Sequence, residues 1–304
     1  MLVINKEQFV YSFGPDMKPV ATVKPGDVIK FITEDCYGGQ VKKKTDVCSA
    51  IDWEHTNPAT GPVFIEGAEP GDAVAVDILD IPTADQGATI PIHNCGPFGD
   101  TTENRTTIFK LKDGKVYWEE KGMVWPYKTM IGVIGLASDK KIPTGWVGNH
   151  GGNMDSNIIT KGVTLWCPVR VKGGLLAMGD LHASMGDGEM CGNGIEVSGE
   201  VIVRVRLLKN FKLNWTVTET DDAWYVNTCG ATCDEAIREG YVEMHRLIMD
   251  AYGMDLTEAN TYMSVQGMLA ANQACLVDEA GGDSFRTGTP KVLNMPPLIG
   301  KRDK

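Results

Sequence analysis

Alternation of apolar and polar residues is the feature that most constrains what this chain can fold into. Between Val197 and Leu207, apolar side chains recur at nearly every second position and oppose charged or hydroxyl groups. Val74, Val76 and Ile78 repeat the pattern in the first third of the chain. Successive side chains of a strand point to opposite faces, so such segments bury one face and expose the other. The pattern predicts half-buried antiparallel strands.

Turn signals separate these runs. The tripeptide Pro-Gly-Asp occurs at residues 25–27 and again at 70–72, and further Gly-containing turns follow at 112–115 and 172–174. The chain contains 35 glycines among 304 residues, well above the average usage of roughly 7%. Many short strands joined by such turns are typical of a sandwich or barrel. We therefore predict a mainly β protein with an antiparallel β-sandwich or barrel portion over residues 1–214.

The pattern changes in the last third of the chain, where helix signals appear. Thr232 followed by Glu235 forms a capping box, and apolar residues then recur at three- and four-residue spacing as far as Gly253, a helix stop. A second segment, rich in Ala and Met, extends from about Thr257 to Cys275, and its methionines are expected to fill a core. Residues 215–304 are predicted to form a smaller α+β portion.

The charge and the cysteines exclude several classes of protein. A net charge of −11 argues against binding to a nucleic-acid backbone, which draws on clustered Lys and Arg. No segment approaches the roughly 20 apolar residues of a membrane span, and the first ten residues lack an export signal. The eight cysteines are scattered through a chain too long to need disulfides. These features predict a cytoplasmic protein with reduced thiols and neither nucleic-acid nor membrane partners.

The segment from residue 179 to 196 is the richest in chemistry. It carries five acidic or imidazole groups among small and apolar residues. If it begins as a strand, Asp180 and His182 point to the same face and Leu181 points to the other. An imidazole and a carboxylate on one face can hold a metal ion. This donor set suits Zn²⁺ and also accepts Mn²⁺ or Fe²⁺.

Polar groups in neighbouring segments extend the candidate site. Gly186 and Gly188 bracket Asp187, and this turn can return Asp187 and Glu189 toward the strand. Two upstream Gly-rich stretches contribute further polar groups, namely His150, Asn153 and Asp155 from one and His93 from the other. A solvated hairpin, or a Ca²⁺ ion that only holds loops, explains the same residues without catalysis. His150 and His93 can equally be hydrogen-bonded histidines that shape their loops.

Four of these stretches resemble the acetamidase/formamidase family. They are residues 149–155, 179–183, 186–189 and 96–100, and the likeness extends in register from about residue 5 to residue 280. The resemblance implies hydrolysis of short aliphatic amides to carboxylate and ammonia, a mainly β fold with an α+β C-terminal part, a bound divalent metal and a homodimer. One departure is Met185, where many members carry Gln, so a pocket-lining amide is absent.

The resemblance and the residues together predict a metal-dependent amidase with defined roles. A bound metal lowers the pKa of water to about 7 and so provides the nucleophile. The predicted roles are metal binding by Asp155, Asp180 and His182; proton transfer by Glu189 or Glu196; oxyanion stabilisation by His150 or glycine amides; and substrate binding by Asn153, Asp187 and His93.

Two other hypotheses stay open at this point. In the first, the Cys191 thiol is the nucleophile of a metal-independent amidase. In the second, the chain is a β-sandwich that binds a metal or a small polar ligand without turning it over.

Overall fold

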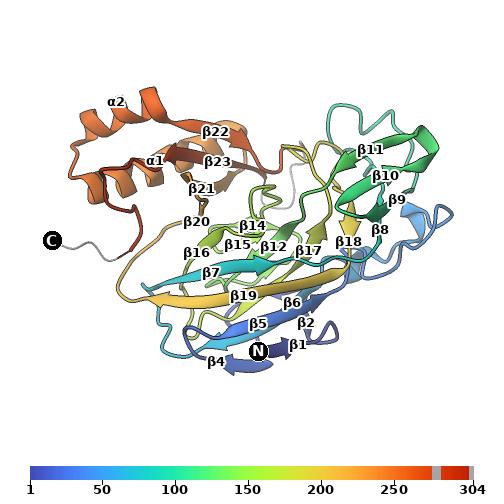
Figure 1. Cartoon of the computed structure of the whole chain (residues 1–304), viewed down its shortest axis with the longest axis horizontal. Helices are drawn as coiled ribbons and strands as arrows, with labels where there is room; N and C mark the ends of the chain where they lie inside the picture. Colours follow the sequence, from blue (N-terminus) through green and yellow to red (C-terminus); the bar gives the residue numbers. More distant parts are fainter. Residues whose placement is uncertain (276–281, 301–304) are drawn as a thin grey trace.

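Two large β-sheets form the frame of this protein, seen in a computed structural model that describes residues 1–275 and 282–300 (Figure 1). Most neighbouring strands are antiparallel, and β1–β5 and β4–β6 are parallel pairs. The first sheet has nine strands, in the order β1 (Leu2–Ile4), β5 (Val28–Thr33), β19 (Gly199–Leu208), β7 (Ala73–Asp80), β16 (Thr164–Pro168), β20 (Thr216–Glu219), β21 (Ala223–Gly230), β23 (Asp283–Pro290) and β22 (Met268–Ala271).

The second sheet has twelve strands and carries most of the candidate site. Its main path runs β11 (Met123–Pro126), β10 (Lys115–Trp118), β9 (Thr107–Lys112), β8 (Gln86–Thr89), β18 (Glu196–Val197), β17 (Leu176–His182), β12 (Met130–Gly135), β15 (Gly151–Asn153) and β14 (Val147–Gly148). A branch joins β17 through β6 (Ala59–Ile65), which also pairs with β2 (Phe9–Val10) and β4 (Ala21–Val23). The short strands β3 (Ser12–Phe13) and β13 (Ile142–Pro143) form a separate pair. Single-turn 3-10 helices cover η1 (Cys48–Ala50), η2 (Trp53–His55) and η3 (Glu119–Lys121).

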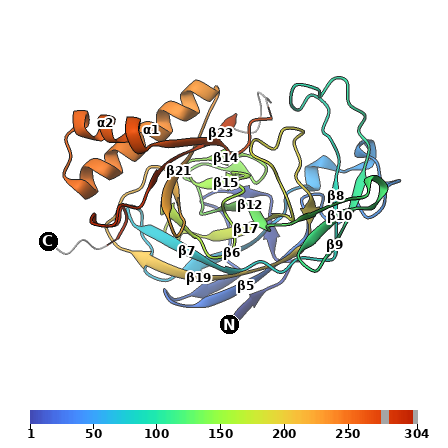
Figure 2. The same cartoon turned by 45° about the horizontal axis from the view of Figure 1, so that its top comes forward.

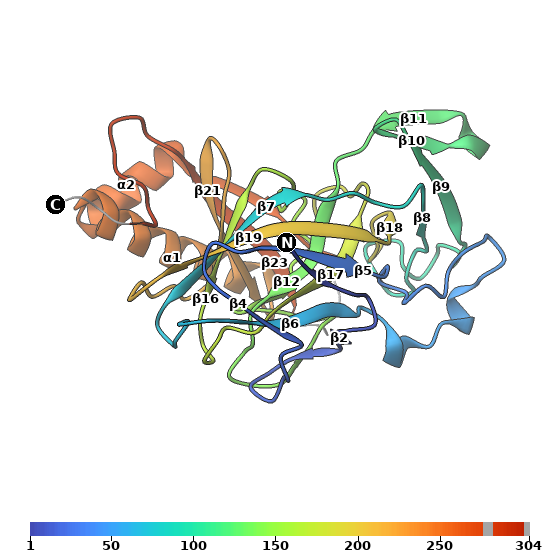
Figure 3. The same ribbon diagram turned by 60° about the horizontal axis from the view of Figure 1, so that its bottom comes forward.

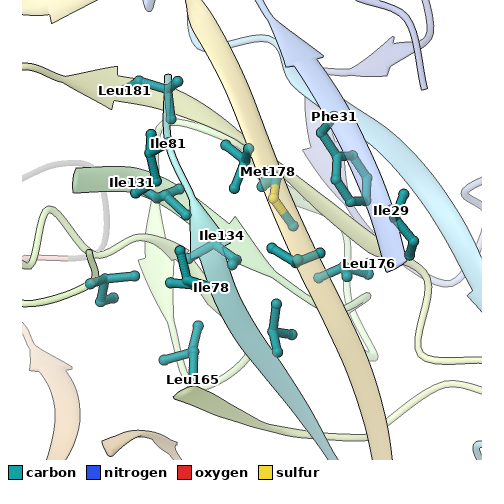
Figure 4. Close-up of a cluster of buried hydrophobic side chains, with 14 of the residues drawn as sticks. Ile29, Phe31, Ile78, Ile81, Ile131, Ile134, Leu165, Leu176, Met178 and Leu181 are labelled. Carbon is teal, nitrogen blue, oxygen red and sulfur yellow. The ribbon is translucent and has the colours of Figure 1, made fainter. Parts of the chain in front are cut away.

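The main core lies between the two sheets (Figure 4). Its buried side chains come from β5, β7 and β19 of the first sheet and from β6, β12 and β17 of the second. In β19, Val201, Val203 and Val205 are fully buried, whereas Arg204 and Arg206 point outward and are exposed. The alternation is therefore satisfied as predicted, and the mainly β, antiparallel sandwich fold is confirmed.

The helices pack at one end of the molecule, against the second half of the nine-stranded sheet (Figures 1 and 2). Helix α1 (Cys233–Tyr252) starts where the Thr232 side chain accepts a hydrogen bond from the Glu235 amide, and it ends at Gly253, which has a φ of 68°. Both ends were predicted, but the capping box is only half formed, because the Glu235 side chain accepts a hydrogen bond from the Ala231 amide and not from the Thr232 amide. The second predicted segment contains two elements, because helix α2 (Leu256–Gln266) ends at Gly267 and β22 follows.

A second core joins these helices to the sheet. Met244, Leu247 and Ile248 of α1 and Met263 of α2 are buried in it, together with Ala73 and Ala75 of β7. The predicted boundary at residue 214 falls between β19 and β20, which belong to the same continuous sheet. Strands β8–β11 lie at the opposite end from the helices (Figure 3). Within the described ranges, neither helix is long and apolar enough to span a membrane.

Candidate active site

The central strand β17 presents Asp180 and His182 on its polar side, but not through regular alternation. Leu176, Met178 and Leu181 all lie in the core between the sheets, although 178 and 181 are an odd number of residues apart (Figure 4). A regular strand would place Asp180 on the same face as Met178. Asp180 instead has a φ of 55°, in the left-handed region. The left-handed conformation of Asp180 interrupts the alternation of side chains along β17. The Leu181 side chain therefore points into the core, whereas the Asp180 and His182 side chains point away from it.

Two other buried carboxylates share this unusual backbone. Asp155 has a φ of 44° and Glu189 a φ of 46°. Residues other than glycine rarely adopt positive φ; each instance costs about 1–3 kcal/mol and persists only where the surrounding structure enforces it. Such strain concentrates at functional sites. Three of the acids in one cluster are therefore held by backbone conformations that local sequence preference disfavours.

The His182 imidazole is the centre of this cluster. It is 1% exposed and four carboxylates surround it, none of them more than 5% exposed. The His182 Nε2 atom lies 3.1 Å from Glu196 Oε2, 3.2 Å from Asp180 Oδ1, 3.8 Å from Asp155 Oδ1 and 3.9 Å from Glu189 Oε1. Four potential negative charges thus face one imidazole away from water. Such a group is costly unless a further positive charge or added protons compensate it.

The shifts in pKa have the same origin. Burial raises the pKa of Asp155 well above its ordinary value, and the charges of Glu189 and Asp180 add to the effect. Burial also raises the pKa of Glu196 to about 8, although His182 opposes the rise. For His182, burial favours the neutral ring, but the neighbouring carboxylates outweigh it and its pKa is raised. Without a bound cation, the cluster therefore retains protons at neutral pH.

Two residues of the candidate site were not predicted from the sequence. The Gln273 side-chain amide donates hydrogen bonds to Asp155 Oδ2 (2.8 Å) and to Glu189 Oε2 (2.9 Å). Cys36, which is 7% exposed, contributes a thiol beside Asp180 and Glu196. Cys36 follows β5 and Gln273 follows β22, so both come from the other sheet. Nothing in their local sequence marks them, because only the packing of the sheets brings them to the site.

The ligand atoms form two adjacent groups that have the dimensions of a metal site. Potential ligand atoms of Asp155, His182 and Glu189 lie within 4.8 Å of one another, as do those of Cys36, Asp180 and Glu196. The three residues predicted to bind metal are thus brought together, but they are divided between the two groups.

A glycine on the neighbouring strand leaves room for the carboxylates. A Cβ atom on Gly132 of β12 would lie only 2.4 Å from Asp155 Oδ1 and 2.8 Å from Asp180 Oδ2. Asp155 Oδ1 itself has no hydrogen-bond partner among the described residues. A buried carboxylate oxygen without a partner, in a space that a methyl group would fill, fits a coordinated cation.

A cavity of about 490 Å³ opens onto the cluster. Asp155, Asp180, Glu189 and Glu196 line its buried part, together with the predicted substrate-binding residue Asn153. Further out, exposed and half-exposed side chains line it, including two tryptophans. The cavity gives a small molecule access to every carboxylate of the cluster.

The other predicted site residues lie outside this cavity. His150 is fully buried against Phe13, with 5.1 Å between ring centroids, and burial lowers its pKa to about 4. Asp187 is exposed and pairs with Arg286 at 2.6 Å. His93 is exposed on the loop that follows β8. The structure therefore does not bring these three side chains to the carboxylate cluster.

The buried acid–imidazole cluster at the end of a cavity is the candidate active site, and comparison with known proteins identifies the class of the protein. The model of the acetamidase/formamidase family matches residues 3–149 and 128–277. The chain belongs to this family and is an amide hydrolase.

Individual relatives carry the same likeness over nearly the whole chain. A formamidase of Methylophilus methylotrophus is 27% identical, covering 92% of this chain and 85% of its own length. A solved structure of a predicted acetamidase/formamidase from Thermoanaerobacter tengcongensis is 34% identical with a TM-score of 0.90 and 95% coverage of both chains. The acetamidase structure from Bacillus halodurans is 31% identical, also with a TM-score of 0.90, and covers 95% of this chain and 97% of its own.

Proposed function

We propose that this protein hydrolyses short aliphatic amides, of the formamide and acetamide type, with a divalent metal at the His182 cluster. The observation that carries the proposal is the group of four buried carboxylates within 3.9 Å of His182 Nε2, open to a cavity. The names of the formamidase and acetamidase relatives support the substrate class.

The donor set suits Zn²⁺. Asp155, His182 and Glu189 would hold the ion, with Asp180 beside them, and carboxylate and imidazole are ordinary zinc ligands. The ion would supply positive charge to polarise the amide carbonyl and an activated water as the nucleophile. Gln273 fixes the two carboxylates that it contacts, as supporting residues around a metal commonly do.

The remaining groups of the cavity serve the substrate. Asn153 is buried, lines the cavity and has a side-chain oxygen without a hydrogen-bond partner among the described residues, so this oxygen can accept a hydrogen bond from the substrate N–H and orient the amide. The side-chain amino group of Asn153 would be the donor that stabilises the developing oxyanion. In this proposal Asn153 takes the role that the sequence offered to His150. Glu196 lies 3.1 Å from His182 Nε2 and lines the cavity, so its carboxylate would accept a proton from the attacking water and return it to the leaving nitrogen.

The test is ammonia release from formamide and acetamide by the purified protein, together with elemental analysis. We expect at least one bound divalent ion per chain. We also expect activity to be lost after chelation and in the His182→Ala variant. His245→Ala is the matched control, because this histidine lies on α1 away from the cavity and its ring hydrogen-bonds the Tyr241 carbonyl in its own helix. Full activity after chelation and in His182→Ala would contradict the proposal.

The alternatives predict different outcomes. A thiol amidase would be inactivated by alkylation of Cys191 and resist chelation. Burial raises the pKa of Cys191, which is opposite to the shift that activates a nucleophilic thiol. A non-catalytic binding protein would contain metal and release no ammonia. Homodimeric assembly and a cytoplasmic location also belong to the proposal, and sedimentation and cell fractionation test them.

A further inference from the structure

The cavity is much larger than the amides of the proposed function require. Formamide and acetamide contain roughly three or four non-hydrogen atoms, whereas pockets of about 300–1,000 Å³ enclose drug-sized ligands. The cavity above the carboxylate cluster measures about 490 Å³. A short aliphatic amide placed at the cluster leaves most of this volume unfilled.

The outer part of the cavity is lined by aromatic rings. Trp53 on η2 is 47% exposed, and Trp146 on the loop between β13 and β14 is 44% exposed. Tyr11 and Ile92 line the same cavity. Large apolar side chains that remain open to solvent beside a polar site favour contact with an apolar ligand group. Such a group would cover ring surface that water otherwise contacts.

Backbone hydrogen bonds fix both tryptophan segments relative to the site. The Trp146 carbonyl accepts a hydrogen bond from the Asn153 amide (3.1 Å), and its own amide donates to Pro143 (3.0 Å). The segment that carries Trp53 is joined to the cluster by the Asn57 amide, which donates to the Cys36 carbonyl (2.7 Å). The backbone segments that carry the two rings are thus bonded to residues that line the cavity, which reduces the entropy cost of ordering these segments when a ligand binds.

The charge of the cavity excludes one kind of large substrate. Glu54 lines its outer part and four carboxylates line its inner part, whereas no Lys, Arg or His among the described residues lines it. A substrate with its own carboxylate would enter without a positive side chain to pair with it and would face like charges. A neutral substrate meets no such penalty.

We propose that the site prefers neutral primary amides whose acyl part carries a ring-sized apolar group, such as phenylacetamide, and that Trp53 and Trp146 determine this specificity. The inference rests on the proposed function. The amide lies at the carboxylate cluster, and the ring lies against the two indoles in the outer cavity.

The test compares kcat/KM for three amides with the metal-loaded protein: acetamide, phenylacetamide and 4-carboxyphenylacetamide. We expect phenylacetamide to exceed acetamide by about tenfold or more, the scale of burying one ring against aromatic surface. The carboxylated analogue should fall below phenylacetamide by about tenfold. Trp53→Ala and Trp146→Ala should each lower the phenylacetamide-to-acetamide ratio several-fold, and Trp146→Phe should restore part of it.

Val242→Ala is the control, because Val242 is 61% exposed on α1 and does not line the cavity. It should leave the ratio unchanged. The inference would be overturned if kcat/KM were lower for phenylacetamide than for acetamide, or if neither tryptophan variant changed the phenylacetamide-to-acetamide ratio. Either result would leave the proposed function standing. A change in assembly state of Trp146→Ala in sedimentation, without a change in ratio, would also overturn the inference, because the ring would then serve a subunit contact. If no amide releases ammonia, the proposed function itself fails.

Discussion

Two of the places where the described part of the chain buries carboxylates treat them in opposite ways. Glu243 of α1 is 2% exposed and accepts hydrogen bonds from the backbone and side chain of Asn214 and from the Arg246 guanidinium, at 2.6–3.0 Å. Burial alone would raise its pKa, but Arg246 and Asn214 outweigh burial and lower it. At the His182 cluster, burial and like charges raise the pKa of Asp155, Glu189 and Glu196.

The difference distinguishes a structural acid from a functional one. Glu243 finds its compensation within the protein, so its charge is satisfied once the chain folds. The four acids around His182 share one imidazole, and the backbone of three of them is strained, so they are compensated only when something positive binds. A buried acid whose pKa is raised among other acids is thus the stronger functional candidate. Four predictions test this comparison.

The largest effect is expected from Asp180→Asn. This change keeps the shape of the side chain but removes one charge next to His182 Nε2. We expect kcat/KM to fall by more than about 100-fold, because even residues behind a metal ligand are worth about 10- to 100-fold. The unfolding free energy of the metal-free protein should not fall, since one of several crowded like charges is gone. Measurements of kcat/KM and of urea denaturation on the same preparation check this. A large loss of stability would contradict the difference between the cluster acids and Glu243.

Glu243→Ala should give the reverse result. Removing the buried Glu243 carboxylate leaves the Asn214 donors without this acceptor, while Arg246 keeps its hydrogen bonds to Asp250 and to the Lys212 carbonyl. We expect the unfolding free energy to fall by about 3 kcal/mol. Activity per folded molecule should be unchanged, because α1 lies at the end of the molecule away from the cavity lining. Urea denaturation and kcat/KM are measured on one preparation. A loss of activity with full stability would show that Glu243 is not structural.

A smaller effect is expected from Gly132→Ala. The added methyl group would meet Asp155 Oδ1 and Asp180 Oδ2 at distances that force one carboxylate to move. Misplacement by about 1 Å in an active site can cost about 100-fold in rate, so we expect a loss of 10- to 100-fold with weaker metal retention. Gly186→Ala is the matched control, since a Cβ there meets nothing within 4 Å. Equal metal content and rates in both variants would contradict a requirement for space at Gly132.

The sequence predicted much of the frame because its signals are local. The valines of β19 and the caps of α1 depend only on residues a few positions apart, and the structure places both as expected. We also expected the Asp180 and His182 side chains to point to the same face, but on the assumption of a regular strand. The left-handed residue that actually turns them toward the cavity leaves no pattern in the sequence, since Asp tolerates this conformation without requiring it.

The rest of the site depends on tertiary packing. Gln273 lies 118 positions from Asp155 in the chain, and Cys36 lies even further from Asp180 and Glu196, the two acids beside it. His150 illustrates the opposite case: it is close in sequence to Asp155, yet its ring packs against Phe13 outside the cavity. A Gly-rich stretch specifies that the chain turns, not which side chain faces the site. Sequence proximity therefore overestimated His150 and could not detect Gln273.

The most gradual expected effect is a pH dependence of stability with opposite signs at the two places. In the metal-free protein, the folded pKa of Glu196 is raised to about 8, so between its unfolded pKa near 4.3 and that value the folded state holds the extra proton. Stability should therefore fall as pH rises from 5 to 8, by at most about 1.4 kcal/mol per pH unit for each such proton.

The raised pKa of His182 acts in the same direction, because its contribution is present below its unfolded pKa and is lost as pH rises through the folded one. The lowered pKa of Glu243 acts in reverse: its contribution is present above its unfolded pKa and is lost as pH falls through the folded one. Urea denaturation of chelator-treated protein at pH 5, 6.5 and 8 measures the first slope, which Glu196→Gln and metal loading should both reduce. Stability that rises from pH 5 to 8 without metal would show that the site acids are already compensated within the protein, as Glu243 is.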